Sequence, residues 1–272
     1  MAKQRSLKHE YELYIEHEIE AYKDSVPRSA LLALGDEAVA ALGEQAQTTL
    51  TEIVLWEEVD RIIASRLKLP TYATWRRRRL RRLAELRRPE RWGLAPDGAL
   101  ARTLREAVGE HVLFADGGAG VEDATLFSAA LGCNVTALTP EPMVLDRMFA
   151  AADEAGVGSQ VRGCVCPLGG WAPDVPLRAV VCAADAFDGL ERDARAHAVL
   201  ELQRATLVGG VHLLRGRPNA PAAVSFDEWR AWYDGWAVTA EPLIGTPGGG
   251  VSDAGASAAE GTYVARRLAR AS

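Results

Sequence analysis

The segment His111-Val-Leu-Phe-Ala-Asp-Gly-Gly-Ala-Gly120 carries the clearest structural signal in this chain. Its first half, His111–Ala115, is a short apolar run of the length expected for a buried strand. A glycine-rich turn follows it, and the next residues, Glu122–Leu131, have the composition of a helix. A strand, a glycine-rich turn and a helix in this order predict one unit of a parallel sheet with helices on its faces.

The same alternation continues to the end of the chain and predicts one α/β domain over residues 96–272. We expect seven strands, at His111–Ala115, Asn134–Leu138, Val161–Cys166, Arg178–Ala183, Val211–Arg215, Trp236–Ala240 and Thr262–Arg267. We expect helices at Ala99–Val108, Glu122–Leu131, Pro142–Glu154, Arg192–Thr206 and Ser225–Tyr233. The stretch Gly245–Gly261 is rich in Gly, Ala and Ser, and we expect it to be a mobile loop.

Residues 1–95 have a helical pattern almost without interruption, which predicts an all-helical region that acts as a cap or an interaction surface. Four helices are expected, and Ser25 is the expected N-cap of the second. The fourth carries a run of arginines, at Arg76, Arg77, Arg78, Arg79, Arg81 and Arg82. The four helices are expected at Leu7–Lys23, at Pro27–Leu42, at Thr48–Leu67 and from Thr71 to Pro89.

The composition is that of a globular protein, with 272 residues of which 48% are hydrophobic and 25% charged. No apolar run approaches the roughly 20 residues that span a bilayer, and Met1–Glu20 is charged throughout, unlike a signal peptide. We therefore expect a cytoplasmic protein without a membrane partner. The net charge is −6, yet Trp75–Arg91 carries nine arginines against two glutamates, which indicates a partner for this segment.

The four cysteines, Cys133, Cys164, Cys166 and Cys182, all lie in or beside apolar stretches. Free cysteine packs as a small hydrophobic residue, so we expect buried, reduced thiols. Cys164 and Cys166 form a C-x-C motif that could hold a soft metal. No second cysteine pair or histidine pair at zinc spacing accompanies them, so we expect no metal site.

Two stretches resemble the class I methyltransferases that depend on S-adenosylmethionine (SAM). In the first, His111–Gly120 and Val135–Met143 are similar to the family's acidic, glycine-rich turn after one strand and its helix start after the next. In the second, Leu200–Leu214 is similar to the family's helix, double-glycine turn and fifth strand. Phe226–Arg230 and Tyr263–Arg267 resemble its closing hairpin. The resemblance covers residues 97–270 and implies a seven-stranded, mostly parallel, Rossmann-like methyltransferase sheet.

A nicotinamide-binding Rossmann domain is the alternative interpretation of the glycine-rich turn. Such a domain is expected to show G-x-G-x-x-G and an acid about 20 residues further on. Here Gly118-Ala-Gly120 is followed by Asp123 in place of the third glycine, and Thr139 stands at the position of the acid. The turn therefore favours the methyltransferase resemblance.

The resemblance implies that SAM is the cofactor. The residues it places around SAM are Asp116, Gly117, Gly118, Gly120, Thr139 and Glu141. Glycines let the backbone approach the methionine moiety, and carboxylates accept hydrogen bonds from the amino group, the ribose and the adenine, each worth about 1.5 to 3 kcal/mol. Asp116 could reach the amino group from a shifted position, and Glu141 could reach the ribose.

The sequence departs from the family at four positions where an acid is expected. These positions hold Phe114 in the first strand, Thr139 after the second, Cys166 or Pro167 after the third and Arg178 at the start of the fourth. The cofactor-binding motif is therefore degraded. Methyl transfer itself requires little from side chains, because the sulfonium is already activated and positioning supplies much of the rate. We assign no catalytic residue.

Three functional hypotheses remain open. The first is a SAM-dependent methyltransferase with an atypical pocket, acting on an unknown acceptor that is a small molecule or a protein. The second is a pseudoenzyme, a non-catalytic scaffold or assembly subunit that acts, as a homo-oligomer or with another protein, through its N-terminal helices. The third and least favoured is nucleic-acid binding through the Arg76–Arg82 helix. His197 and His212 are interpreted as structural.

Overall fold

The computed structural model describes residues 6–43, 52–115, 122–216, 226–242 and 261–269. The chain divides into two compact units, Met1–Arg82 and Leu83–Ser272. Residues 83–95, which the sequence analysis placed with the helical region, belong to the second unit by their contacts. Leu86 is buried in the core beside the sheet, and Trp92 Nε1 donates a hydrogen bond of 2.7 Å to its carbonyl oxygen.

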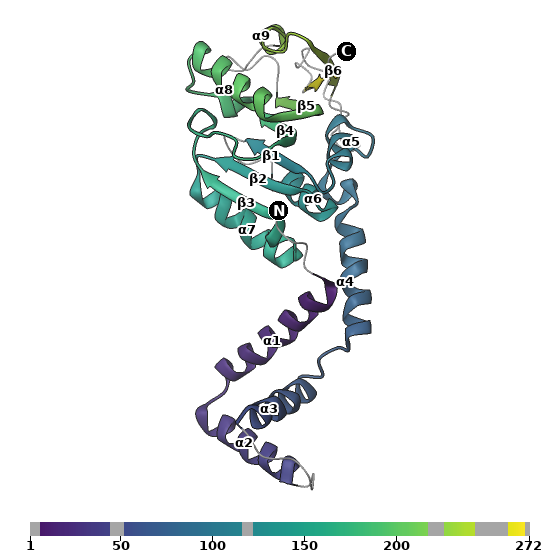
Figure 1. Ribbon diagram of the computed structural model, residues 1–272, viewed down its shortest axis with the longest axis vertical. Helices are drawn as coiled ribbons and strands as arrows, with labels where there is room; N and C mark the ends of the chain where they lie inside the picture. Colours follow the sequence, from purple (N-terminus) through teal and green to yellow (C-terminus); the bar gives the residue numbers. More distant parts are fainter. Residues whose placement is uncertain (1–5, 44–51, 116–121, 217–225, 243–260, 270–272) are drawn as a thin grey trace, which may run out of the picture. The chain divides into compact units, whose positions relative to one another are not determined.

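The first unit is helical, as expected. It contains α1 (Leu7–Ser25), α2 (Arg28–Gly43), α3 (Glu52–Arg66) and most of α4 (Tyr72–Leu86), which continues into the second unit (Figure 1). Its small core consists of Ile19, Leu34, Ala38, Val59 and Ile63.

The prediction that Ser25 is the N-cap of the second helix is wrong. Ser25 is the last residue of α1, where its hydroxyl donates to the carbonyl oxygen of Tyr22 at 2.8 Å. It therefore closes the first helix and does not start the second. The helix instead begins at Arg28, and the carbonyl oxygen of Pro27 accepts from Ala30 N at 2.9 Å.

The second unit contains one sheet of seven strands in the order β3-β2-β1-β4-β5-β7-β6. Strands β1 to β5 pair in parallel, and β7 is antiparallel to both β5 and β6. All seven expected strands are present, with small differences at their ends. Their bounds are β1 (His111–Ala115), β2 (Asn134–Thr139), β3 (Val161–Val165), β4 (Leu177–Ala183), β5 (Thr206–Gly216), β6 (Trp236–Pro242) and β7 (Gly261–Arg267).

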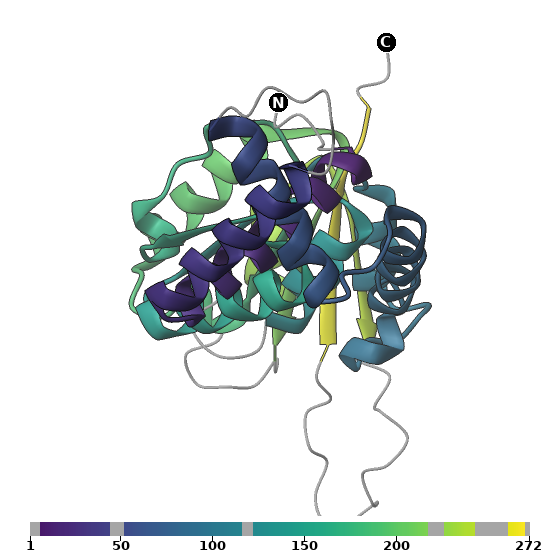
Figure 2. The same cartoon turned by 90° about the horizontal axis from the view of Figure 1, so that it is seen from below.

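Helices cover both faces of this sheet (Figures 1 and 2). Successive side chains of a strand point to opposite faces, and β1 follows this rule. Phe114 packs into the core with α5 (Ala99–Glu106), α6 (Glu122–Leu131) and α7 (Pro142–Ala155). Leu113 packs into the other core, with α8 (Arg192–Ala205) and α9 (Phe226–Trp232). The short 3-10 helices are η1 (Pro89–Trp92), η2 (Gly158–Gln160), η3 (Leu168–Gly170) and η4 (Ala184–Phe187).

The double-glycine turn lies within β5, which begins earlier than the sequence predicted. Leu177 pairs with Thr206, but Ala179 already pairs with Val211, so the intervening residues of β5 bulge out of the ladder. Gly209 has a φ of +76°, and a Cβ on Gly210 would lie 2.5 Å from Cγ2 of Thr206. The bulge therefore requires both glycines, one for its backbone conformation and one for lack of space.

Among the residues that the structure describes, no helix combines the length and apolar character needed to cross a membrane.

Candidate functional site

The carboxyl ends of the parallel strands meet at one edge of the sheet, where α/β proteins bind their ligands. Strand β1 occupies the middle of this edge, between β2 and β4. Four of the six expected cofactor-binding residues follow β1 in the sequence and lie outside the described residues: Asp116, Gly117, Gly118 and Gly120. The other two, Thr139 and Glu141, are described and lie at and just beyond the end of β2, the strand next to β1.

Thr139 is buried, and its polar atoms are already engaged. Its Oγ1 accepts a hydrogen bond of 3.2 Å from the backbone N–H of Glu141, and its carbonyl oxygen accepts one of 3.1 Å from Cys166 N. The first bond shapes the entry into α7, and the second joins the ends of β2 and β3. Thr139 therefore organises the backbone at the place where the family has a ribose-binding acid.

Glu141 is exposed at the N-cap position of α7, and its side chain makes no capping bond to that helix. Its carboxylate has no hydrogen bond or ion pair within the part of the chain that the structure describes. Glu122, at the start of the neighbouring helix α6, is instead engaged by Arg147 of α7 at 2.7 Å. Glu141 therefore presents oxygen atoms that no described residue engages, whereas those of Glu122 are partly used by Arg147.

The three other positions where the family has acids serve structural purposes here. Phe114 is 1% exposed and fills the core between β1 and the helices α5 to α7. The backbone N–H of Cys166 donates a hydrogen bond to the carbonyl oxygen of Thr139 in β2. Pro167 is the residue before η3. Arg178 lies at the opposite, amino edge of the sheet, where its guanidinium donates to the carbonyl oxygen of Val208 at 3.3 Å.

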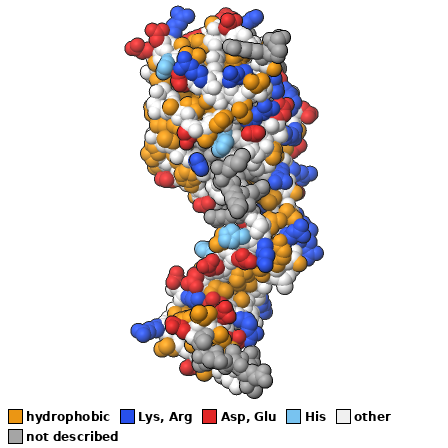
Figure 3. Space-filling view, viewed as in Figure 1, with side chains coloured by type: hydrophobic (Ala, Val, Ile, Leu, Met, Phe, Trp, Pro, Cys, Tyr) orange, Lys and Arg blue, Asp and Glu red, His pale blue; other side chains and the backbone are white. Residues whose placement is uncertain are grey.

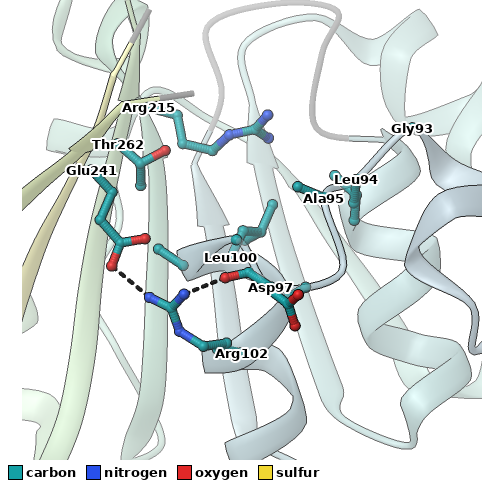
Figure 4. Close-up of a pocket in the computed structure, with 12 residues that line it drawn as sticks. Gly93, Leu94, Ala95, Asp97, Leu100, Arg102, Arg215, Glu241 and Thr262 are labelled. Atoms are coloured by element: carbon teal, nitrogen blue, oxygen red, sulfur yellow. Dashed lines mark hydrogen bonds and ion pairs between the residues drawn. The ribbon is translucent and has the colours of Figure 1, made fainter. Parts of the chain in front are cut away.

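A pocket of about 230 Å³ lies at the carboxyl edge, two strands away from β1 (Figure 4). Its walls are the loop before α5, the first turn of α5 and the ends of β5 and β6 with the start of β7. Leu94 and Leu100 supply apolar surface, and Thr262 and Arg215 supply hydrogen-bond donors. Figure 4 shows Arg215 extending from β5 toward the loop that carries Leu94 and Ala95.

The pocket wall is held in place by Arg102 of α5. Its guanidinium forms an ion pair with Glu241 of β6 and donates to the carbonyl oxygen of Asp97. Arg105 also donates to the carbonyl oxygen of Pro96 at 2.7 Å. These bonds tie the loop before α5 to the sheet. The pocket was not predicted from the sequence, although Arg215 and Thr262 lie at strand ends that the expected topology brings to this edge.

The two histidines interpreted as structural differ in burial. His197 is an exposed residue of α8. His212 is completely buried, with Nε2 2.6 Å from Thr206 Oγ1 and Nδ1 2.6 Å from the hydroxyl oxygen of Tyr233. Burial, with a smaller contribution from the Arg267 guanidinium, lowers the pKa of His212 to about 3. His212 is thus a neutral core residue.

The sheet has the seven, mostly parallel strands that the resemblance implied, and the antiparallel β7 lies between β5 and β6. The described part of the chain therefore has the fold of a class I methyltransferase. We base this assignment on the strand order and strand directions themselves. No protein-family model matches the sequence, and no curated protein matches it.

Several solved structures to which this chain is similar at low identity bear the name methyltransferase or methylase. N-methyltransferase NodS from Bradyrhizobium japonicum is 12% identical, with a TM-score of 0.47 over 64% of this chain and 100% of that one. An rRNA methylase from Streptococcus thermophilus is 13% identical, with a TM-score of 0.46 over 62% of this chain and 93% of that one. TehB from Haemophilus influenzae is 17% identical, with a TM-score of 0.44 over 58% of this chain and 57% of that one. NodS has also been solved with S-adenosyl-L-homocysteine.

Proposed function

We propose that this chain is a SAM-dependent methyltransferase whose cofactor binds at the carboxyl edge of the sheet, over the ends of β1 and β2. A fold alone does not imply a function, so the proposal rests on the site. The observation that carries it is the exposed carboxylate of Glu141 beside the end of β2, without a partner among the described residues.

The end of β2 supports binding of one part of the cofactor, the ribose. Ribose hydroxyls donate hydrogen bonds to a carboxylate, and Glu141 offers one that its own helix does not use. The Thr139 backbone and hydroxyl hold the entry of α7 in place, which positions Glu141. No acid is available for the adenine amine at Cys166 or Pro167. We therefore expect SAM to bind more weakly than it does in family members with the full set of acids.

SAM supplies an activated methyl group, so the chain's own task is to bind, orient and exclude water. In this proposal Asp116 and the glycines of its turn, Gly117, Gly118 and Gly120, receive the methionine part, as the resemblance implies. The pocket beside α5 receives the acceptor. Its volume of about 230 Å³ is smaller than the roughly 300 to 1,000 Å³ of drug-sized ligand sites. The acceptor group is therefore small, and the Arg215 and Thr262 donors favour a polar one.

Calorimetric titration of the full chain with SAM and with S-adenosylhomocysteine tests this proposal. We expect saturable heats and a rise in melting temperature, because a ligand that binds only the folded state stabilises it. The absence of heat and of a thermal shift at millimolar concentrations of both compounds would remove the proposal.

A non-catalytic methyltransferase-fold subunit is the second candidate, and exposed apolar side chains on the helical unit favour it. Leu32 and Val39 on α2 are 63% and 45% exposed, and Ile53 and Trp56 on α3 are 71% and 53% exposed. Such side chains are enriched at protein interfaces. Sedimentation analysis over a wide concentration range would support this candidate if the chain self-associates while failing to bind SAM.

A further inference from the structure

Cys164 and Cys166 bring their sulfur atoms to 3.2 Å from each other at the end of β3. The backbone explains this proximity. Cys166 N donates to the carbonyl oxygen of Cys164 at 3.1 Å, so the chain makes a three-residue turn centred on Val165. In a regular strand the two side chains would share a face at a greater distance, and the turn brings them closer together.

We propose that Cys164 and Cys166 are a redox modification site that forms a reversible disulfide within the chain. A disulfide bond measures about 2.05 Å, so the two sulfur atoms need to approach by little more than about 1 Å. Cys166 N also donates to the carbonyl oxygen of Thr139 at 3.1 Å, which ties the turn to β2. The pair is therefore already brought together in the reduced chain.

The exposure of the four cysteines makes this pair the selective target. Cys164 and Cys166 are both partly exposed, whereas Cys133 and Cys182 are buried in the two cores. Burial raises the pKa of the Cys182 thiol to about 12, which suppresses its reactive thiolate. Burial, together with the neighbouring Cys164 thiol, raises the pKa of Cys166 to about 11. Cys164 and Cys166 are therefore the two thiols that an oxidant in solution reaches.

The oxidant is a low-molecular-weight disulfide such as oxidised glutathione. The thiolate of one cysteine attacks one of its sulfur atoms, and one glutathione thiolate leaves. The thiol of the other cysteine loses its proton and attacks the Sγ atom of the first, which releases the second glutathione. The two cysteines together lose two protons and two electrons, and the oxidant becomes two thiols.

A closed metal site is a weaker interpretation of the same pair. Within the described part of the chain, no three side chains of His, Cys, Asp or Glu lie together in a way that could hold a metal ion. A structural zinc site requires four ligands, and two thiols supply half of them. Dithiol chemistry needs only the two sulfur atoms that the turn brings together.

The test is to incubate the full, folded chain with oxidised glutathione, to block the remaining thiols under denaturing conditions, and to measure intact mass and peptide masses. We expect loss of two of the four alkylatable thiols, no retained glutathione and a disulfide between Cys164 and Cys166. The Cys166→Ser variant should instead retain one glutathione on Cys164, and the Cys133→Ser control should still form the disulfide.

Three outcomes would overturn the proposal: glutathione retained on the unsubstituted chain, a disulfide that includes Cys133 or Cys182, or four thiols that stay reduced. Circular dichroism of each variant confirms that the folded chain is the species tested. None of these measurements depends on SAM. A negative result would therefore contradict the disulfide proposal and leave the proposed function untouched.

Discussion

The Nδ1 atom of His212 lies 2.6 Å from the hydroxyl oxygen of Tyr233, deep in the core between β5 and α9. The neighbouring bonds fix the direction of the proton in this contact. Thr206 Oγ1 donates its one hydrogen to the carbonyl oxygen of Leu202 at 2.7 Å, so it can only accept from His212 Nε2. Nδ1 is then the acceptor, and the Tyr233 hydroxyl is its donor.

Tyr233→Phe should destabilise the α/β unit by about 1 to 3 kcal/mol, because it leaves the buried Nδ1 without a donor. Urea unfolding at pH 8, where His212 is neutral in both states, measures the effect. A variant as stable as the unsubstituted chain would show that the proton direction argued above is wrong.

Stability should decrease as the pH falls below about 6.5. The pKa of His212 is about 3 in the folded chain and about 6.5 when unfolded, so between these values only the unfolded chain binds the proton. The stabilisation is therefore complete above pH 6.5 and is lost as the pH falls toward 3. Between pH 7 and pH 5 the loss from His212 alone is about 2 kcal/mol.

Nuclear magnetic resonance of the folded chain checks the cause of this loss directly. The imidazole signals of His212 should keep their neutral positions down to about pH 4, unlike those of an exposed histidine. Titration of His212 near pH 6.5 in the folded state would contradict the explanation, whatever the stability curve.

Gly210→Ala should destabilise the chain by about 1 to 3 kcal/mol. The new Cβ would lie 2.8 Å from the carbonyl oxygen of Leu207 and 3.0 Å from that of Arg178, and backbone atoms cannot move aside cheaply. Gly170→Ala is the control in the same unit, because its Cβ would meet Pro167 at an ordinary 3.7 Å. Thermal unfolding compares the two, and equal effects would argue against the steric role of Gly210.

Glu141→Gln should weaken SAM binding by about tenfold or more, because a hydrogen bond to a charged acceptor is worth roughly 1.5 to 3 kcal/mol. Asp146→Asn is the matched control: Asp146 is another exposed acid of α7, farther from the end of β2. Calorimetric titration measures both. An equal loss in the two variants would point to net charge, and no loss in Glu141→Gln would remove Glu141 from the site.

Nucleic-acid binding through α4 stays a prediction. Figure 3 shows basic side chains gathered over this helix. Arg76, Arg77, Arg78 and Arg81 are exposed and have no ion pair with any described residue. Two acids of the preceding helix α3, Glu58 and Asp60, pair with Arg61 and Lys23.

Fluorescence anisotropy with short generic RNA and DNA over a salt series tests this prediction. A plot of the logarithm of the binding constant against the logarithm of the salt concentration gives a negative slope. The double variant Arg77→Glu/Arg81→Glu should make this slope shallower by about 0.7 to 0.9 for each phosphate that the chain no longer neutralises. Arg162→Glu/Arg192→Glu changes the net charge equally at exposed sites elsewhere and should bind normally. Absence of binding by the unsubstituted chain at low salt would dismiss the prediction.

The order and type of the elements could be predicted from the sequence, because they follow from local patterns. The apolar run His111–Ala115 and the helix Glu122–Leu131 have the predicted bounds, since each is set by its own composition and by the glycines between them. The seven-stranded, mostly parallel sheet was implied by the resemblance and is confirmed. The ends of β5 were missed, because its bulge depends on the close approach of Arg178 from the neighbouring strand.

Only the tertiary structure determines which polar groups at the carboxyl edge are bonded and which are available to a ligand. The sequence pattern can place Thr139, Glu141, Cys164 and Cys166 near one edge of a sheet. Whether the carbonyl oxygen of Thr139 is free or already bonded depends on Cys166 N, which only the folded sheet brings within 3.1 Å of it. The same holds for the 3.2 Å between Cys164 and Cys166, because that distance is set by a turn anchored on β2.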